Sequence, residues 1–253
     1  MKWRVIQAAV AGTSHHREQL PCQDHCVAAT YECGSGEVLA IVVADGAGSA
    51  CHGGRGAQLA CQGVRQAIEA WVPAAVAAVP TTTTVAEWLA TAREVLLQAA
   101  AEEGASVRDF ACTLLIAVIT ARAAGYAHIG DGGIVIDGGD GLQLVFWPEA
   151  GEYANMTRFI TDEDALEQVR VLYSDAPPDE IAVFTDGIQR LALDYKARAV
   201  HGPFFAPMLA VLRRQLPSEC AELAEQLAAF LASPRVNSRT DDDKTLVLAS
   251  RRE

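Results

Sequence analysis

An aspartate that directly follows a long apolar run is the feature that most limits how this chain can fold. Residues 38–48 read V-L-A-I-V-V-A-D-G-A-G, and the apolar, partly β-branched part is typical of a buried strand. Burial of that strand fixes Asp45 at its end, where Gly46 and Gly48 let the backbone approach whatever the carboxylate holds. A carboxylate in such a position is costly unless it is paired or bound to a metal. We therefore expect the rest of the chain to supply partners for Asp45.

The composition fits a folded, acidic protein. Of the 253 residues, 51% are hydrophobic, which is enough for a large core and disfavours disorder over most of the length. We expect a single domain over residues 1–253. The net charge of −12, from 20 basic and 32 acidic side chains, disfavours nucleic acid or an anionic membrane as the main partner. It is compatible with an enzyme that binds cations.

The N-terminal sequence and the cysteines indicate the compartment. No stretch reaches about 18 consecutive apolar residues and the first residues lack a signal-peptide pattern, so we predict a cytoplasmic protein. The seven cysteines are scattered, which is typical of reduced, mostly buried thiols. Zinc ligation by Cys22, His25 and Cys26 is disfavoured because no second pair of ligands follows at finger-like spacing.

The order of the expected elements indicates an α+β fold. Strands are expected at 3–11, 26–31 and up to Asp45, with a polar loop over 12–24. Helices are expected at 54–78 and 85–103, followed by strands at 110–120, 125–129, 134–136 and 142–146, with G-D-G-G and D-G-G-D-G as hairpin turns. Next we expect a weaker strand at 153–160, a short helix or loop at 162–168, and strands at 169–173 and 180–185. The chain should end with helices at 204–216 and 218–231, the second capped by Ser218, a polar loop at 233–240 and a strand at 245–249. Strands and helices thus segregate rather than alternate.

Aspartates at strand ends form the candidate site. Four loops carry one, mostly beside glycine, and a fifth group precedes the last strand; they are Asp24, Asp45, Asp131, Asp186 and residues 241–243. Mg²⁺ and Mn²⁺ prefer such oxygen ligands. Because Asp-Gly is also a common turn dipeptide, composition alone leaves a metal site and a set of ordinary turns about equally open.

The ordered motifs resemble a known family. The segments V-A-D-G-A-G-S, I-G-D-G-G, F-T-D-G-I and D-D-K-T-L-V-L resemble the signature segments of the metal-dependent type 2C serine/threonine protein phosphatases. The earlier segment G-T-S-H-H-R-E-Q-L-P-C-Q-D resembles the first motif of a bacterial branch of that family. The resemblance runs from about residue 5 to residue 249. It implies a four-layer α-β-β-α sandwich, in which two central antiparallel sheets are flanked by helix pairs, with a two-metal site at one end.

The resemblance also implies roles for the aspartates. Asp45 would bridge two Mg²⁺ or Mn²⁺ ions, with Gly46 offering its backbone carbonyl. Asp186 and Asp242 would complete the shell of one ion, Asp24 would hold the other through a water, and Asp131 would support a weaker third ion. Where the family has D-N-x-T, this chain has D-D-K-T, and the first aspartate of that motif is Asp242.

The implied reaction is hydrolysis of phosphoserine and phosphothreonine in proteins. Water made acidic by two metal ions would supply the hydroxide, without a covalent enzyme intermediate. His16 is the histidine chosen as proton donor to the leaving group, although no motif separates it from His15, His25 and His52. Arg17 is the expected phosphate ligand, with Arg4 as the more distant candidate. The physiological partner would be a phosphorylated protein, in opposition to a serine/threonine kinase.

Two departures from the family pattern leave alternatives open. The glycine-rich turn here contains Ala47 and Ser49, and Gly132-Gly133 stands where the family has Ser-Arg. A catalytically inactive relative that serves as a binding or regulatory module is one alternative, disfavoured because every expected metal aspartate is present. A small-molecule phosphatase of the same fold is another. A dinucleotide-binding protein is disfavoured because Cys51 stands at the third glycine position and no βαβ alternation follows.

Overall fold

Two antiparallel sheets form the centre of the molecule. The computed structural model describes residues 2–34, 36–73, 80–147 and 157–252. One sheet has the strand order β1 (Arg4–Val10), β12 (Lys244–Ser250), β9 (Glu180–Phe184), β6 (Gly133–Asp137) and β7 (Gln143–Leu144). The other has the order β2 (Asp24–Cys33), β3 (Gly36–Asp45), β4 (Leu114–Ile119), β5 (Ala124–Ile129) and β8 (Arg170–Ser174). We call them the β1 sheet and the β2 sheet.

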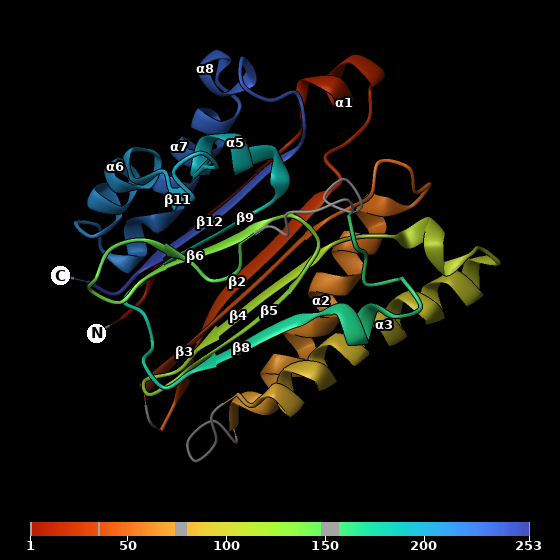
Figure 1. Ribbon diagram of the computed structural model, residues 1–253, viewed down its shortest axis with the longest axis horizontal. Helices are drawn as coiled ribbons and strands as arrows, with labels where there is room; N and C mark the ends of the chain where they lie inside the picture. The colour runs from red at the N-terminus through yellow and green to blue at the C-terminus, as the bar shows by residue number, and fades with distance from the viewer. Residues whose placement is uncertain (1, 35, 74–79, 148–156, 253) are drawn as a thin grey trace.

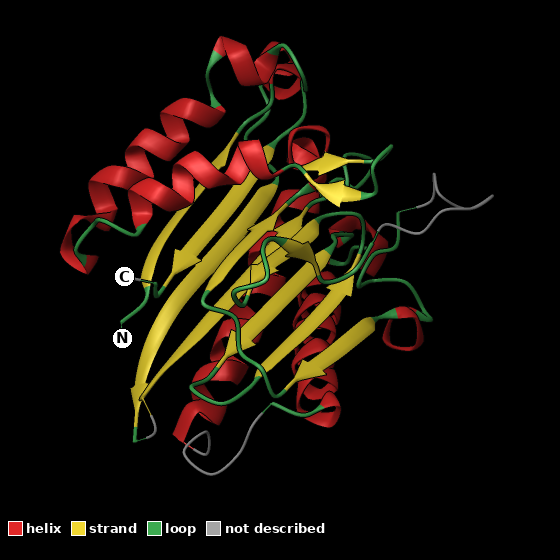
Figure 2. Cartoon of the chain, turned by 60° about the vertical axis from the view of Figure 1, so that its left-hand side comes forward, coloured by secondary structure: helices red, strands yellow, loops and turns green. Residues whose placement is uncertain are grey.

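Helices cover the outer faces of both sheets. The long helices α2 (Gly53–Trp71) and α3 (Thr82–Glu103) pack on the β2 sheet, and α6 (Gly202–Leu212) and α7 (Cys220–Leu231) cover the β1 sheet (Figure 1). The shorter elements are α1 (Thr13–Glu18), η2 (Val107–Phe110), α4 (Ala165–Gln168), η3 (Asp186–Ile188), α5 (Gln189–Ala192), β10 (Leu193–Asp194), β11 (Ala199–Val200), η4 (Pro217–Glu219) and α8 (Pro234–Asn237). Figure 2 shows the strands between the two groups of helices, so the expected four-layer sandwich is confirmed.

Strand β3 shows why the strand before Asp45 is apolar without alternation. Val38, Val42 and the other residues on the same face of β3 pack toward α2 and α3. Their neighbours Leu39 and Ile41 face the β1 sheet. Because both faces of the strand are covered, every position from 38 to 44 is buried. Burial of each large side chain stabilises the fold by about 2 kcal/mol.

Several local expectations are wrong, each because a tertiary contact or a cap decides the structure. The loop at 12–24 contains helix α1. At the start of α1, the N–H and the Oγ of Ser14 both donate to the carbonyl of Asp241. The apolar run at 110–120 begins with the last residue of η2, a short helix that the Ser106–Asp109 capping box stabilises at its start. Strand β4 therefore starts only at Leu114. Ser218 does not cap α7, because it lies inside η4. The loop at 233–240 contains α8.

One wrong expectation concerns the site itself. The G-D-G-G segment is not a hairpin turn, because β5 belongs to the β2 sheet and β6 to the β1 sheet. The chain therefore crosses from one sheet to the other at Asp131. The second expected turn does join the antiparallel pair β6 and β7.

Two expected elements fall partly outside the described residues. Helix α2 ends at Trp71, and residues 74–78 of the expected helix lie outside the described part. Of the expected strand at 153–160, residues 153–156 are not described and 157–160 are not in a strand. In the described part of the chain, no helix is both long enough and apolar enough to cross a membrane.

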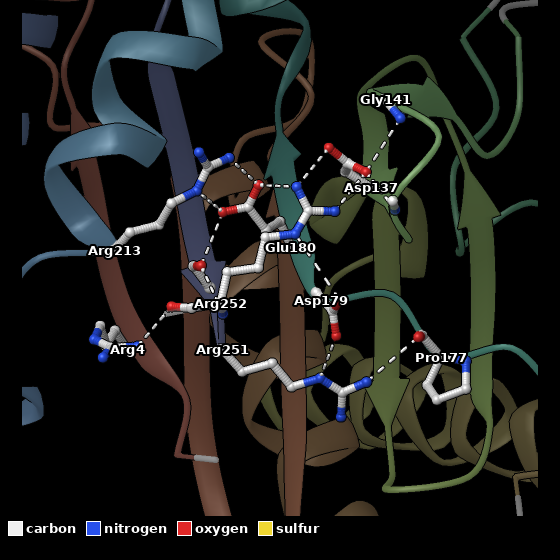
Figure 3. Close-up of polar contacts among 11 residues, drawn as sticks. Arg4, Asp137, Gly141, Pro177, Asp179, Glu180, Arg213, Arg251 and Arg252 are labelled. Carbon is white, nitrogen blue, oxygen red and sulfur yellow. Dashed lines mark hydrogen bonds and ion pairs between the residues drawn. The ribbon is translucent and has the colours of Figure 1, made fainter.

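A buried ionic cluster joins the C-terminal residues to the start of β9. Glu180 is 0% exposed, and Arg213 donates to both of its carboxylate oxygens, over 2.7 and 2.6 Å. Ser250 Oγ also donates to Glu180, over 2.8 Å, and Arg252 bridges Glu180 and Asp137. Figure 3 shows the two guanidinium groups directed at these two carboxylates. Opposite charges thus neutralise the buried acid at this end of β9.

Replacement of Glu180 by alanine should destabilise the protein by about 3 kcal/mol, because it leaves two arginines without their buried partner. The matched control is Glu32→Ala, which breaks an ion pair with Lys2. Both side chains of that pair are 69% exposed, so the midpoint should hardly change. Urea unfolding midpoints measure both. Equal losses in the two variants would contradict a stabilising role for the cluster.

Candidate metal centre

Loops from both sheets bring the aspartates to one end of the sandwich. In the β2–β3 ladder, Asp24 lies directly opposite Asp45. Asp186 follows β9 of the other sheet, Asp131 lies in the crossing between sheets, and Asp242 precedes β12. Four of these five, all except Asp24, line a cavity of about 230 Å³. The cavity is further lined by Gly46, Ala47, Gly48, Ser49, His15, Gln23, Thr113, Thr157, Phe159 and Asp243.

Glycine allows the loops to approach this closely. A Cβ at Gly187 would lie 1.9 Å from the carbonyl oxygen of Asp243, so the loop after Asp186 packs directly against the loop that holds Asp242. At Gly46 a Cβ would lie 2.3 Å from the carbonyl carbon of Gly53, at the start of α2. The Asp-Gly pairs therefore serve close backbone approach.

Hydrogen bonds hold the aspartates in place. The backbone N–H of Asp45 donates to Thr113 Oγ1 over 3.0 Å, and the N–H of Thr113 donates to the Asp45 carbonyl over 2.8 Å. Thr185 Oγ1 donates to Asp24 Oδ2 over 2.7 Å, across the two sheets. Thr157 Oγ1 donates to Asp131 Oδ2 over 2.6 Å. Thr113 and Thr157 lie outside the sequence motifs, and Thr185 lies within F-T-D-G-I, where no role was expected of it.

The carboxylates lie close enough to repel one another. Burial, followed by the negative charges of Asp24, Asp186 and Asp131, raises the pKa of Asp45 to about 11. Burial raises the pKa of Asp24 to about 7, and burial with the charges of Asp131 and Asp242 raises the pKa of Asp186 to about 6. Lys244, whose Nζ donates to the Asp242 carbonyl over 3.0 Å, is a basic side chain near these acids, but the acids outnumber it.

The donor set fits a hard divalent cation. Oδ1 of Asp24 and Oδ1 of Asp186 are buried without a hydrogen-bond partner among the described residues. An unpaired buried carboxylate oxygen is costly, and oxygen-only donors with excess negative charge suit Mg²⁺ or Mn²⁺. Within the described ranges, no three His, Cys, Asp or Glu side chains are already gathered as a ready-made ligand set. The acidic side chains would thus have to move closer together to ligate an ion.

His15, rather than His16, is the histidine at the cavity. His15 Nδ1 lies 2.8 Å from Oδ1 of Asp243, a carboxylate that also accepts the N–H groups of Gly12 and Gln23. His16 is exposed and does not line the cavity. The choice of His16 is not supported by its position, because α1 turns successive side chains in different directions.

The remaining histidine and arginine candidates lie elsewhere. His25, whose pKa burial lowers, and His52, whose ring is 5.0 Å from that of Phe110, do not line the cavity. The side chain of Arg17 is 70% exposed and bonds to the Thr13 carbonyl and to Asp241. Arg4 donates to the carbonyls of Gln215 and Arg252. No arginine is among the described residues that line the cavity, so the structure does not bring Arg17 to the site.

An acidic cavity at the ends of two antiparallel sheets, inside a four-layer sandwich, is the architecture that the sequence resemblance implied. Comparison with known proteins agrees. The sequence profile described as protein phosphatase 2C matches residues 11–232. The chain is 42% identical over 250 residues to serine/threonine-protein phosphatase 3 of Escherichia coli (strain K12), and the match covers 98% of each chain. The chain belongs to the protein phosphatase 2C family.

Solved structures share the fold at low sequence identity. The serine/threonine phosphatase of S. agalactiae superposes with a TM-score of 0.61 at 16% identity, covering 98% of this chain and 99% of that one. Stp1 from Staphylococcus aureus gives 0.64 at 12% identity, with 100% and 96% covered. The catalytic domain of PstP, in complex with two manganese ions, gives 0.60 at 16% identity, with 98% and 97% covered.

The raised pKa values predict how the stability of the metal-free protein varies with pH. A carboxyl whose folded pKa is raised keeps its proton while the unfolded chain loses it, so stability falls as pH rises from about 4 toward the folded value. Between pH 4 and pH 7 the stability of Asp24→Asn should therefore rise relative to that of the wild type by on the order of 3 kcal/mol. Urea unfolding in a chelator measures this. A pH-independent difference between the two proteins would contradict it.

Proposed function

We propose that this protein hydrolyses phosphoserine and phosphothreonine in proteins, using two Mg²⁺ or Mn²⁺ ions and a weaker third one. The convergence of Asp45, Asp131, Asp186 and Asp242 on one cavity is the observation that carries the proposal. The name of the E. coli relative and the manganese ions in the PstP structure support it. We further propose that it acts in the cytoplasm on targets of a serine/threonine kinase.

Each aspartate has a distinct task in this proposal. Asp45, the carbonyl of Gly46, Asp186 and Asp242 would hold the two main ions directly, and Asp24 would act through water. Asp131, fastened by Thr157 and by Gln189, which donates to its carbonyl, would hold the third. When bound, the ions acidify water and offset the charge of the phosphoryl oxygens. The protein supplies acidic ligands that its two sheets bring to one cavity.

His15 is the proposed proton donor to the leaving seryl or threonyl oxygen. The Asp243 carboxylate accepts hydrogen bonds, so Nδ1 of His15 carries the proton that joins them. In the imidazolium form Nε2 carries the second proton, which would pass to the leaving oxygen and leave the ring neutral. Because Asp243 also holds Gly12 and Gln23, the ring is attached to a rigid support. Asp243 is thus a positioning residue and His15 the catalytic one.

The alternatives receive no support from the site. An inactive binding module would be expected to have lost an acidic ligand, and none of the six expected metal residues is replaced. A small-molecule phosphatase of the same fold would release phosphate from metabolites and not from phosphopeptides. Steady-state rates on a phosphothreonine peptide and on small phosphate monoesters separate these functions.

Asp45→Asn and Asp186→Asn should each lower kcat/KM for p-nitrophenyl phosphate at least about a hundredfold, because each removes an anionic metal ligand. Asp131→Asn should act mainly at low Mn²⁺ concentration. The exposed Asp140→Asn is the matched control and should change nothing. Manganese titration by calorimetry should show weaker binding in the first two variants. Near-normal turnover in either, with intact fold, would rule out this site.

His15→Gln should lower kcat on a phosphothreonine peptide about a hundredfold, because the alkoxide leaves poorly without a proton. The loss on p-nitrophenyl phosphate should be at least about tenfold smaller, since nitrophenolate is a stable anion. His16→Gln, on the neighbouring exposed residue, is the matched control. Equal losses of His15→Gln on the two substrates would show that His15 acts only structurally.

A further inference from the structure

A second, larger cavity lies on the outer side of the β1 sheet. It is a groove of about 710 Å³ between α5, α6, α7 and α8, and we call it the helical groove. Its apolar lining includes Met208 and Phe204 of α6 and Leu223, Leu227 and Phe230 of α7. Phe204, Met208, Leu223 and Phe230 are only partly buried. An apolar surface left open in this way is typical of a binding site.

The rim of the helical groove is cationic. Arg190, Arg235 and Arg239 line it together with His201, and none of its described lining residues is an aspartate or glutamate. None of the three arginine side chains has an ion pair or hydrogen bond within the described part of the chain. Glu222 and Glu225 lie on α7 but do not line the groove. The protein as a whole carries a charge of −12, so this cationic rim is a local exception.

The cationic rim lies next to the metal centre along the chain. Arg190 follows Asp186 by four residues, and Arg239 precedes Asp242 by three. An extended chain spans at most about 3.6 Å per residue, which places the two Cα atoms of each pair within about 15 and about 11 Å. Helix α8, which carries Arg235, lies at the same end of the sandwich as α1 (Figure 1). A segment seated in the groove therefore needs only a few further residues to reach the cavity.

We propose that the helical groove docks an acidic segment of the phosphoprotein substrate, one whose apolar side chains enter the groove. The apolar floor requires apolar side chains, and the unpaired arginines require carboxylates beside them. The net charge of −12 disfavours an anionic membrane surface as the occupant. The nearness of the rim to Asp186 and Asp242 favours the substrate over an unrelated partner. This inference rests on the proposed phosphoprotein phosphatase activity.

The test compares three substrates of different charge with the full-length protein. These are phosphorylated casein, which is acidic, phosphorylated histone, which is basic, and p-nitrophenyl phosphate, which has no docking segment. The variants are Arg235→Glu with Arg239→Glu, and Met208→Glu. The matched control is Arg122→Glu, on an exposed arginine at the β4–β5 turn.

The double arginine variant should raise KM for casein about tenfold and leave or lower KM for histone. Met208→Glu should raise KM for casein by a similar factor, while Arg122→Glu should not. Added salt should raise the wild-type KM for casein, and less so in the double variant. Equal changes for casein and histone, or no change for casein, would overturn the docking inference. Failure of the wild type on both phosphoproteins, with p-nitrophenyl phosphate hydrolysed, would instead overturn the proposed function.

Discussion

Two like-charged side chains held face to face are the constraint on which this structure depends. Asp24 and Asp45 lie opposite each other at the end of the β2–β3 ladder, a pairing that is unfavourable by itself. A slip in the register of the two strands cannot separate them, because a slip of one residue would move every side chain of β3 to the opposite face of the sheet. The core formed by both faces of β3 therefore holds the repelling carboxylates together.

The two ends of β9 show how differently the fold treats buried acids. At its start, Glu180 is neutralised by Arg213 and Arg252. Past its end, Asp186 meets further aspartates, and no arginine lines the described part of the cavity. Lys244, whose Nζ donates to the Asp242 carbonyl over 3.0 Å, brings one positive charge near these acids, and a bound cation would offset more of their repulsion.

The family resemblance implied the four layers, which the structure confirms, and local patterns identified aspartates of which Asp45, Asp131, Asp186 and Asp242 line one cavity. Apolar runs over 38–45 and 180–185 specify buried strands, and Asp-Gly at their ends needs no knowledge of distant contacts. The sheet crossing at Asp131 was not predictable in this way, since a G-D-G-G segment suits a hairpin equally well. Nor was helix α1, whose start is fixed by Asp241 and Asp243, more than two hundred residues along the chain.

Helix α1 also explains why the histidine and arginine candidates could not be ranked from the sequence. Residues one or two positions apart on a helix face different directions, so once His15 meets Asp243, His16 and Arg17 must point elsewhere. Residue 243 thus determines which histidine lies at the cavity. The family pattern has asparagine at this position, and this chain has aspartate. A carboxylate there accepts a ring N–H and two backbone N–H groups at once, which an amide with a single acceptor oxygen does less well. The departure from the family motif and the choice of histidine are therefore one feature of the site.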